Sequence, residues 1–124
     1  MKHNFATAIV ALHPNAEFFC TDEYSSIEWD SSNNESKPTE EVLTAKIAEL
    51  DEAEAKKLLR VERNELLRLC DWVVVRAQET STAVPSEWVT YRQQLRDLPA
   101  TADPKLDSDF ELDYSSFTWP TKPS

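Results

Sequence analysis

The first third of the chain alternates short apolar runs with polar breaks. Residues 5–12 are rich in apolar and β-branched side chains and end at the turn signal His-Pro-Asn of residues 13–15. Two further short runs, 16–20 and 26–29, follow with polar residues between them. Short runs bounded by turn residues are typical of strands. The pattern predicts a small antiparallel β meander of three strands, which needs a packing partner because so small a sheet is marginal alone.

A polar linker and a helix start come next. Residues 30–37 contain almost no apolar side chain, and Pro38 marks a boundary after them. Thr39 is of a type favoured at helix N-caps. Glu40 and Glu41 then place carboxylates in the first turn, where the helix dipole favours negative charge. A long helix is therefore predicted to begin at Thr39.

Between residues 39 and 72 the composition predicts one long central helix. The segment is rich in Ala, Leu, Glu, Lys and Arg and lacks both Pro and Gly. Its apolar residues form a stripe that drifts around the axis, with only alanines and charged residues at 51–57. Three successive valines at 73–75 disfavour helix, so we expect the helix to end near Trp72.

A shorter second helix is predicted after the polar loop at residues 78–83. It ends near Asp97, because Pro99 restricts the residue before it. One face carries two aromatics and a leucine at i, i+3 and i+7, namely Trp88, Tyr91 and Leu95. We expect this face to form an antiparallel helical hairpin by packing against leucines of the first helix, namely Leu66, Leu67 and Leu69.

The C-terminal segment alternates acidic and apolar side chains and then becomes an extended tail. Acidic residues at 107, 109, 111 and 113 alternate with Phe110, Leu112 and Tyr114, as in a half-buried strand with a charged outer face. A final edge strand is predicted at 116–119. The elements together predict an α+β protein, with a small β unit in residues 1–37 and a helical hairpin with an extended tail in residues 38–124.

Composition and charge exclude several classes of function. The 124 residues contain no glycine, which argues against phosphate-binding loops, dinucleotide fingerprints and nucleophile elbows, because each needs a residue without Cβ. A net charge of −10 disfavours binding to nucleic acid and to anionic membranes. No apolar run approaches the length of a membrane span. The N-terminal run fits a signal peptide poorly, so we expect a protein of a reducing cytoplasm.

Candidate catalytic and metal-binding groups are sparse. A structural zinc site places its cysteine and histidine ligands in close pairs. The chain has no such pair among its cysteines and histidines, which are Cys20, Cys70, His3 and His13. The acidic residues at 107–113 resemble the start of a calcium loop, but the glycine of its sixth position is missing. Nothing in the sequence buries carboxylate pairs such as Glu62 and Glu65. We therefore predict no cofactor, no metal ion and no enzymatic activity.

Aromatic residues are the strongest candidates for a functional surface. Trp and Tyr are the residues most enriched at binding hot spots, and an arginine beside a tryptophan can bind a partner by stacking and bidentate pairing. The candidates for partner binding are Trp72, Trp88, Tyr91, Arg92, Leu95 and Trp119. The apolar members could equally form the hairpin core, and Arg92 a solvated ion pair, so both interpretations stay open.

Three segments carry a family resemblance. They are residues 60–72, residues 88–99 and the Trp-Pro-Thr-Lys-Pro run at 119–123, and the Tyr-Arg-x-x-Leu-Arg-Asp-Leu-Pro run at 91–99 is the most specific of their elements. These segments closely resemble the phage tail assembly chaperone proteins, particularly the version found in tailed phages of marine bacteria and cyanobacteria. Segments upstream, such as 11–18 and 37–50, are similar as well. The valines at 73–75 depart from the polar turn that members usually have there.

The resemblance implies a small, non-catalytic protein that binds other phage tail or tail-fibre proteins in the host cytoplasm during assembly. The alternative is a structural component, such as a tail or fibre adaptor or decoration, that stays in the virion. Neither nucleic acid nor membrane is expected as a partner. Association with further copies of the chain, and the identity of the tail protein bound, stay open.

Overall fold

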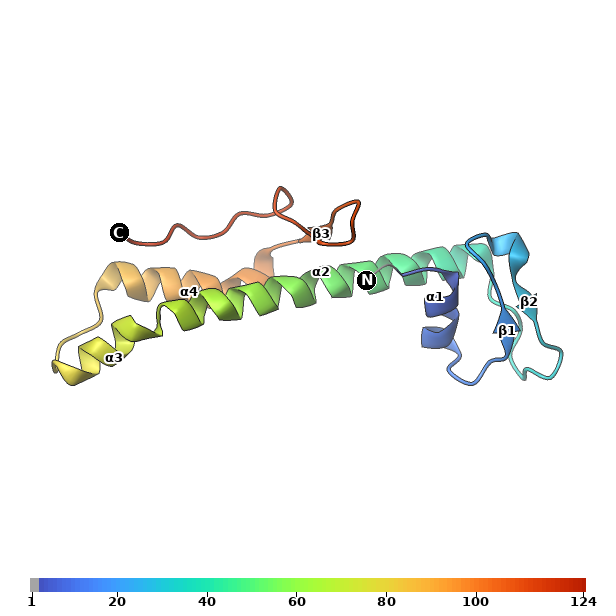
Figure 1. Ribbon diagram of the computed structural model, residues 1–124, viewed down its shortest axis with the longest axis horizontal. Coiled ribbons are helices and arrows are strands. Elements are labelled where there is room, and N and C mark those ends of the chain that lie inside the picture. The colour runs from blue at the N-terminus through green and yellow to red at the C-terminus, as the bar shows by residue number, and fades with distance from the viewer. Residues whose placement is uncertain (1–2) are drawn as a thin grey trace. The chain divides into compact units, whose positions relative to one another are not determined.

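A computed structural model of the protein describes residues 3–124, and its contacts divide the chain into two units, Met1–Glu54 and Ala55–Ser124. The long helix α2, Glu40–Leu69, begins in the first unit and ends in the second (Figure 1). Helix α2 starts directly after Thr39, whose hydroxyl accepts the Val42 N–H at 3.3 Å, so the predicted start is confirmed. The predicted division into domains after residue 37 stays a prediction.

The first element of the first unit is a helix and not the strand predicted at residues 5–12. Helix α1 spans Phe5–Leu12. Its N-cap is Asn4, whose Oδ1 accepts the Thr7 N–H at 3.0 Å, while the Asn4 N–H donates to Thr7 Oγ1 at 2.8 Å. This reciprocal capping box satisfies two backbone donors at once. The periodicity of a short apolar run is the same in a buried strand and in a buried helix, so it could not distinguish the two structures at residues 5–12.

The sheet of the first unit has two strands where three were predicted. Strand β1, Phe18–Phe19, pairs antiparallel with β2, Glu28–Trp29, and the 3-10 turn η1, Tyr24–Ser26, lies between them. The register places Phe18 opposite Trp29, and their rings stack at 6.5 Å between centroids. Both strands fall inside the predicted runs at 16–20 and 26–29.

The core of the first unit lies between α1, the sheet and the first turns of α2. Its buried members are Ala8, Ile9, Ile27 and Leu43. The polar segment 30–37 is tied to this unit, because Asn33 exchanges two hydrogen bonds with the backbone of Glu17, each 2.8 Å long. The Trp29 indole N–H also donates to the Glu35 carbonyl at 2.9 Å.

The valines predicted to end the helical region are themselves helical. Helix α2 ends at Leu69, and after a turn at Cys70 helix α3 spans Asp71–Glu79. A valine costs about 0.5 kcal/mol in helix propensity, whereas full burial of its side chain gains roughly 1.5–3 kcal/mol. Val73 is completely buried, so packing outweighs propensity. The long helix does end close to the predicted residue, at Leu69, but the expectation that the valines are not helical is wrong.

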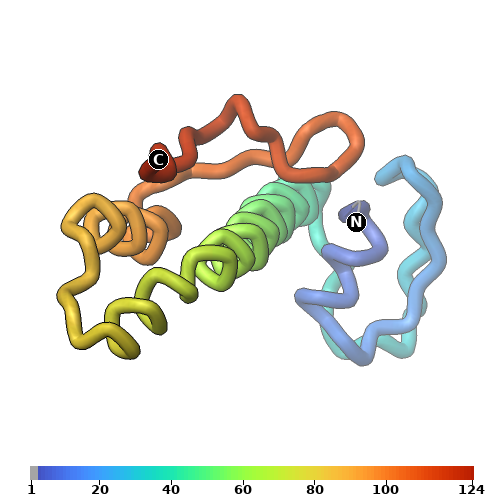
Figure 2. Tube along the Cα trace, turned by 60° about the vertical axis from the view of Figure 1, so that its left-hand side comes forward, coloured from blue at the N-terminus to red at the C-terminus, as the bar shows by residue number. Residues whose placement is uncertain are grey.

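Helix α4 packs antiparallel to the end of α2, as the predicted hairpin requires. It spans Ser86–Thr101. Arg63 Nη1 donates to the Arg96 carbonyl at 3.2 Å, and Arg92 Nη1 donates to the Leu67 carbonyl at 3.0 Å. From the first bond to the second, the residue on α2 rises by four, from 63 to 67, while the residue on α4 falls by four, from 96 to 92. Such opposite directions are the relation of antiparallel helices. Figures 1 and 2 show α4 beside this part of α2.

Two details of the hairpin differ from the prediction. Helix α4 does not stop before Pro99 but continues to Thr101, and the Ala102 N–H closes its last turn on the Leu98 carbonyl at 2.9 Å. A proline inside a helix lacks the N–H of its own backbone bond and its ring crowds the carbonyl four residues earlier, so Pro99 weakens the last turn of α4 without ending the helix. Leu69, expected to pack against α4, is 55% exposed, whereas Leu66 and Leu67 pack against the core cluster as predicted.

A second small sheet follows α4, at a different place from the predicted strand at 116–119. Strand β3, Lys105–Leu106, pairs antiparallel with β4, Leu112–Asp113, and the acidic residues at 107–111 form the turn between them. The Tyr114 hydroxyl donates to Glu62 Oε2 on α2 at 2.9 Å. Two residues on the same face of α2 as Glu62, Ala55 seven positions before it and Leu59 three positions before it, are completely buried.

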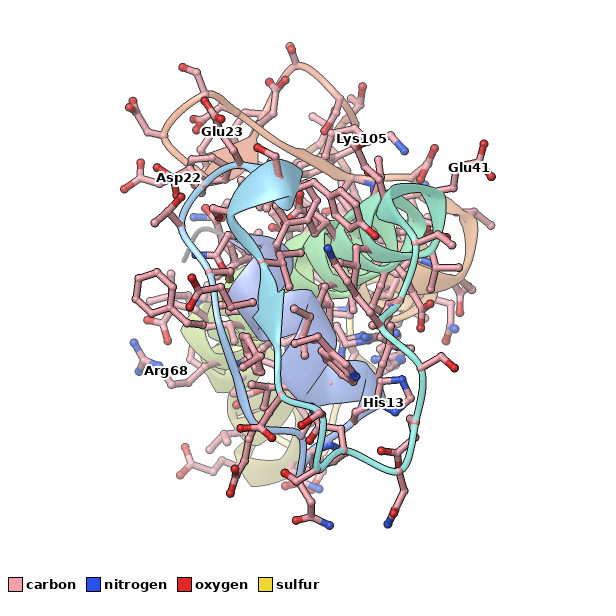
Figure 3. All side chains as sticks on the ribbon, turned by 90° about the vertical axis from the view of Figure 1, so that its right-hand side faces the viewer. His13, Asp22, Glu23, Glu41, Arg68 and Lys105 are labelled. Carbon is pink, nitrogen blue, oxygen red and sulfur yellow. The ribbon has the colours of Figure 1, made fainter. Side chains whose placement is uncertain are left out.

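The two units differ strongly in charge. Residues 1–54 hold three basic and twelve acidic side chains, a net charge of −9, whereas residues 55–124 hold ten and eleven, a net charge of −1. Figure 3 labels three of the exposed carboxylates of the first unit, Asp22, Glu23 and Glu41. None of the helices within residues 3–124 combines the length and the apolar character that crossing a membrane requires.

Candidate functional site

Three of the six candidate residues lie inside the core of the second unit. Trp88, Tyr91 and Leu95 are 6%, 5% and 0% exposed. They form one cluster with Cys70 and Val73, against which Leu66 and Leu67 also pack. The Trp88 and Tyr91 rings meet edge to face at 6.0 Å, and burial raises the pKa of Tyr91 above its ordinary value. These side chains hold α3 and α4 on the end of α2.

Arg92 joins the helices at the break between α2 and α3. Besides its bond to the Leu67 carbonyl, its Nη1 donates to Cys70 Sγ at 3.0 Å, and its Nη2 donates to Asp71 Oδ1 at 3.0 Å. Burial alone would lower the pKa of Arg92, but the bonds to Cys70 and Asp71 outweigh it and raise the pKa. One guanidinium therefore adds a donor to the Leu67 carbonyl at the end of α2, which also accepts the Cys70 N–H at 3.2 Å.

Trp119 lies at the edge of the same cluster. Its side chain is partly buried and packs against the core from the C-terminal tail. The ring of Phe117 meets it edge to face at 5.0 Å between centroids. Trp119 thus anchors the tail to the helices.

Trp72 is the candidate that faces outward. It is 50% exposed on α3. Arg76, one turn later, stacks on the Trp72 ring, with its Cζ 4.8 Å from the ring centroid. The Trp88 ring meets the Trp72 ring edge to face at 5.8 Å between centroids. Val75, also 50% exposed, shares this side of the helix. We call Trp72, Val75 and Arg76 the α3 face.

The family model described as phage tail assembly chaperone protein matches residues 56–124, more than half of the chain. The chain belongs to this family. Neither the search of curated proteins nor the search of solved structures found a match.

The match to the tail assembly chaperone family coincides with the second unit. It begins at residue 56, whereas the unit begins at Ala55. All six candidate residues and the α3 face lie within it. The similarity suggested for segments upstream of residue 56 is outside the matched range and stays a prediction.

The sequence prediction missed two members of the α3 face in this member of the family, Val75 and Arg76. Both follow the point at which the helix was predicted to end. The available signal was the i, i+4 spacing of Trp72 and Arg76, which places a cation beside an aromatic ring once the segment is helical. The burial of Val73 and Ala77 on the opposite side of α3 completes that amphipathic pattern.

The titratable groups of this family member serve local structure. Arg68 holds Glu65 through two hydrogen bonds and lowers the pKa of that carboxyl. Glu62 accepts from the Tyr114 phenol and thereby raises the pKa of Tyr114. Asp107 Oδ1 accepts the Asp109 and Glu111 N–H groups in the β3–β4 turn. Within residues 3–124, no three His, Cys, Asp or Glu side chains gather closely enough to hold a metal ion.

Proposed function

We propose that the protein binds other tail or tail-fibre proteins while the phage tail assembles in the infected host cell, and that it does so without catalysis. A chaperone role in tail assembly follows from the family to which the chain belongs. The observation that carries the binding proposal is the half-exposed Trp72 with Arg76 stacked on it, in the unit that matches the family.

The α3 face has the chemistry of a binding hot spot. Tryptophan and arginine are the residue types that dominate such sites. The Trp72 ring is held between Arg76 and Trp88, so little side-chain freedom remains to be lost when a partner covers it. Val75 extends the contact with an aliphatic surface. The buried candidates, Trp88, Tyr91 and Leu95, support this face from below.

Replacing Trp72 tests the proposal directly. We expect Trp72→Ala to weaken binding to tail or fibre proteins of the same phage by more than about 1 kcal/mol, or about fivefold or more in Kd. The measurement is quantitative co-purification of the tagged chain from infected cells, followed by titration of the proteins recovered. Helicity by circular dichroism should stay close to that of the parent chain.

Two further variants make the test selective. Val61→Ala removes another exposed apolar side chain, 61% exposed on α2, and should leave binding unchanged. Trp88→Ala should instead lower the free energy of unfolding by about 3–5 kcal/mol, because Trp88 is in the core. Equal binding by Trp72→Ala and Val61→Ala would show that the α3 face is not the contact surface.

The timing of binding is tested by comparing purified virions with infected-cell lysate by quantitative mass spectrometry. Presence in lysate and absence from virions is the result expected of an assembly chaperone. A fixed copy number in virions near a multiple of three or six would instead identify a retained adaptor or decoration, because structural parts follow the symmetry of the tail.

A further inference from the structure

The outer face of the β1–β2 sheet presents an exposed aromatic side chain. Phe18 and Trp29 pack against the core of the first unit. Side chains alternate between the two faces of a strand, so Phe19 and its register partner Glu28 face outward. Phe19 is 60% exposed. A single exposed ring does not by itself make a binding surface, so the groups around it decide what the face can bind.

Carboxylates surround this ring. The Asp30 N–H donates to the Glu17 carbonyl at 3.2 Å, so these two residues continue the strand pairing by one step. By the same alternation they share the outer face with Phe19 and Glu28. The side chains of Glu17, Glu28 and Asp30 are all exposed. A hollow of about 320 Å³ lies on the sheet and is lined by both strands together with Glu17 and Asp30.

The lysines of the first unit are engaged elsewhere. Residues 3–54 contain two lysines and no arginine. Lys37 lies over the Tyr24 ring, with its Nζ 4.6 Å from the ring centroid, and Lys46 Nζ pairs with Glu49 Oε1 at 3.1 Å. Within the described residues, the carboxylates of the outer face make no ion pair. The unit, with its net charge of −9, therefore offers this face to a cation of another molecule.

An arginine matches both components of the face. Its planar guanidinium stacks on an aromatic ring and donates paired hydrogen bonds to a carboxylate. Phe19 and Glu28 are direct cross-strand neighbours, whose Cβ atoms lie about 5 Å apart in such pairs, so one arginine can reach both. Glu17 precedes Phe19 by two positions, about 7 Å along a strand, and an extended segment repeats its side chains on one face at the same interval. A second arginine two positions away would then meet Glu17 and Asp30.

We propose that the outer face of the β1–β2 sheet is a docking site for an extended segment of a partner protein that carries arginines at alternate positions. Charge complementarity selects this occupant, because the acidic unit repels nucleic acid, anionic membranes and a second copy of itself. The same attraction speeds the encounter with a basic segment. The face lies outside the family-matched residues 56–124, so it is a second surface that does not depend on the α3 face.

The test uses the full chain and the fluorescein-labelled peptide Ser-Arg-Thr-Arg-Thr-Arg-Ser as the probe, followed by fluorescence anisotropy. The ionic strength is about 0.1 M, at which charges more than about 10 Å apart are largely screened. We expect saturable binding. Phe19→Ala should weaken it about threefold or more, because the contact of the guanidinium with the ring is lost. Glu28→Gln should weaken it by about the same factor, because a charge-assisted hydrogen bond is lost.

Matched variants in the same unit separate this face from general attraction by its charge. Glu41→Gln removes one exposed carboxylate on α2, labelled in Figure 3. Val42→Ala removes another apolar side chain, 48% exposed. Both should bind within about twofold of the parent, because neither residue is on the sheet. A peptide of the same composition with its arginines consecutive should bind more weakly than the probe, because neighbouring side chains of an extended segment point to opposite faces.

Four results would overturn the proposal: equal weakening by Glu28→Gln and Glu41→Gln, unchanged binding by Phe19→Ala, equal binding of the two peptides, or no saturable binding. Circular dichroism checks the fold of each variant, and Glu28→Gln, which changes only an exposed carboxylate, keeps the test valid if Phe19→Ala disturbs the sheet. Trp72→Ala should bind the probe normally, and a loss there would assign the peptide to the α3 face instead. Normal peptide binding without any co-purified tail protein would contradict the proposed function alone.

Discussion

Ser81 occupies a backbone position that glycine normally fills. Its φ is 56°, in the left-handed region. The Thr82 N–H donates to the Ala77 carbonyl at 2.9 Å, and the Ser81 N–H donates to the Gln78 carbonyl at 3.3 Å. These two bonds are those of the Schellman motif that ends many helices, and the residue at this position is most often glycine. In a chain without glycine, serine takes the position at a steric cost of roughly 1–2 kcal/mol.

Ser81→Gly is therefore expected to stabilise the protein. Relief of the steric cost exceeds the extra freedom that glycine gives the unfolded chain, so the free energy of unfolding should rise by about 0.5–1 kcal/mol. Chemical denaturation followed by circular dichroism measures the change. Ala83→Gly, two residues later and outside the left-handed region, should lower stability by about 0.5–1 kcal/mol. A loss of stability in both variants would contradict the strain assigned to Ser81.

At the residue scale, the spacing of apolar side chains predicted which residues share the buried face of α4, but not the direction in which Trp72 points. Trp88, Tyr91 and Leu95 were found from their i, i+3, i+7 spacing, and they do share the buried face of α4. Trp72 follows a break in the helical phase at Cys70. The sequence does not show this break. The i, i+4 spacing of Trp72 and Arg76 indicates an exposed face only once the segment after the break is taken as helical.

At the scale of elements, the sequence predicted those whose local signals agreed. Helix α2 was predicted because its cap, its acidic first turn and its composition all favour helix. Helices α1 and α3 were missed because an apolar run and three valines each favour strand locally. Their tertiary contacts decide otherwise, since Ile9 and Val73 are completely buried. The β3–β4 pair was missed because the alternating residues at 107–113, which favour a single strand, contain the turn between two strands.

The β3–β4 pair should weaken at low pH through Asp113. Its Oδ1 accepts the Ser115 N–H at 2.9 Å and the Ser115 hydroxyl at 2.6 Å. These hydrogen bonds hold the pKa of the Asp113 carboxyl below its ordinary value of 3.8. The unfolded chain then takes up a proton at higher pH than the folded chain. The stabilisation is therefore complete above the unfolded pKa and is lost as the pH falls through the lowered folded pKa.

Asp113→Asn separates this contribution from that of the other carboxylates. The amide oxygen still accepts both Ser115 hydrogen bonds but does not titrate. We expect the melting temperature of the parent chain to fall more steeply below about pH 4 than that of the variant. Asp109→Asn, at a carboxylate that accepts no hydrogen bond within the described residues, should follow the parent. If the melting temperatures of all three chains fell equally with pH, Asp113 would not be the cause of the weakening at low pH.

For the whole molecule, the family resemblance was predictable and the extent of the match was not. The sequence runs at 60–72, 88–99 and 119–123 lie within the matched range and within the second unit. They contain the residues that build the hairpin core and anchor the C-terminal tail. The unit boundary falls inside the continuous helix α2, between Glu54 and Ala55, within the stretch 51–57 whose alanines and charged residues interrupt the apolar stripe.

The uneven distribution of charge makes the two units respond differently to ionic strength. A unit with a net charge of −9 repels itself, whereas one with −1 hardly does. Raising the salt from about 0.01 M to about 0.15 M shortens the screening length from about 30 Å to about 8 Å. Backbone amides around Ile27 should then exchange hydrogen more slowly, while those around Leu95 change little. Equal slowing at both would mean that self-repulsion does not limit the first unit. Salt would therefore tighten the acidic unit selectively and leave the family-matched unit nearly unaffected.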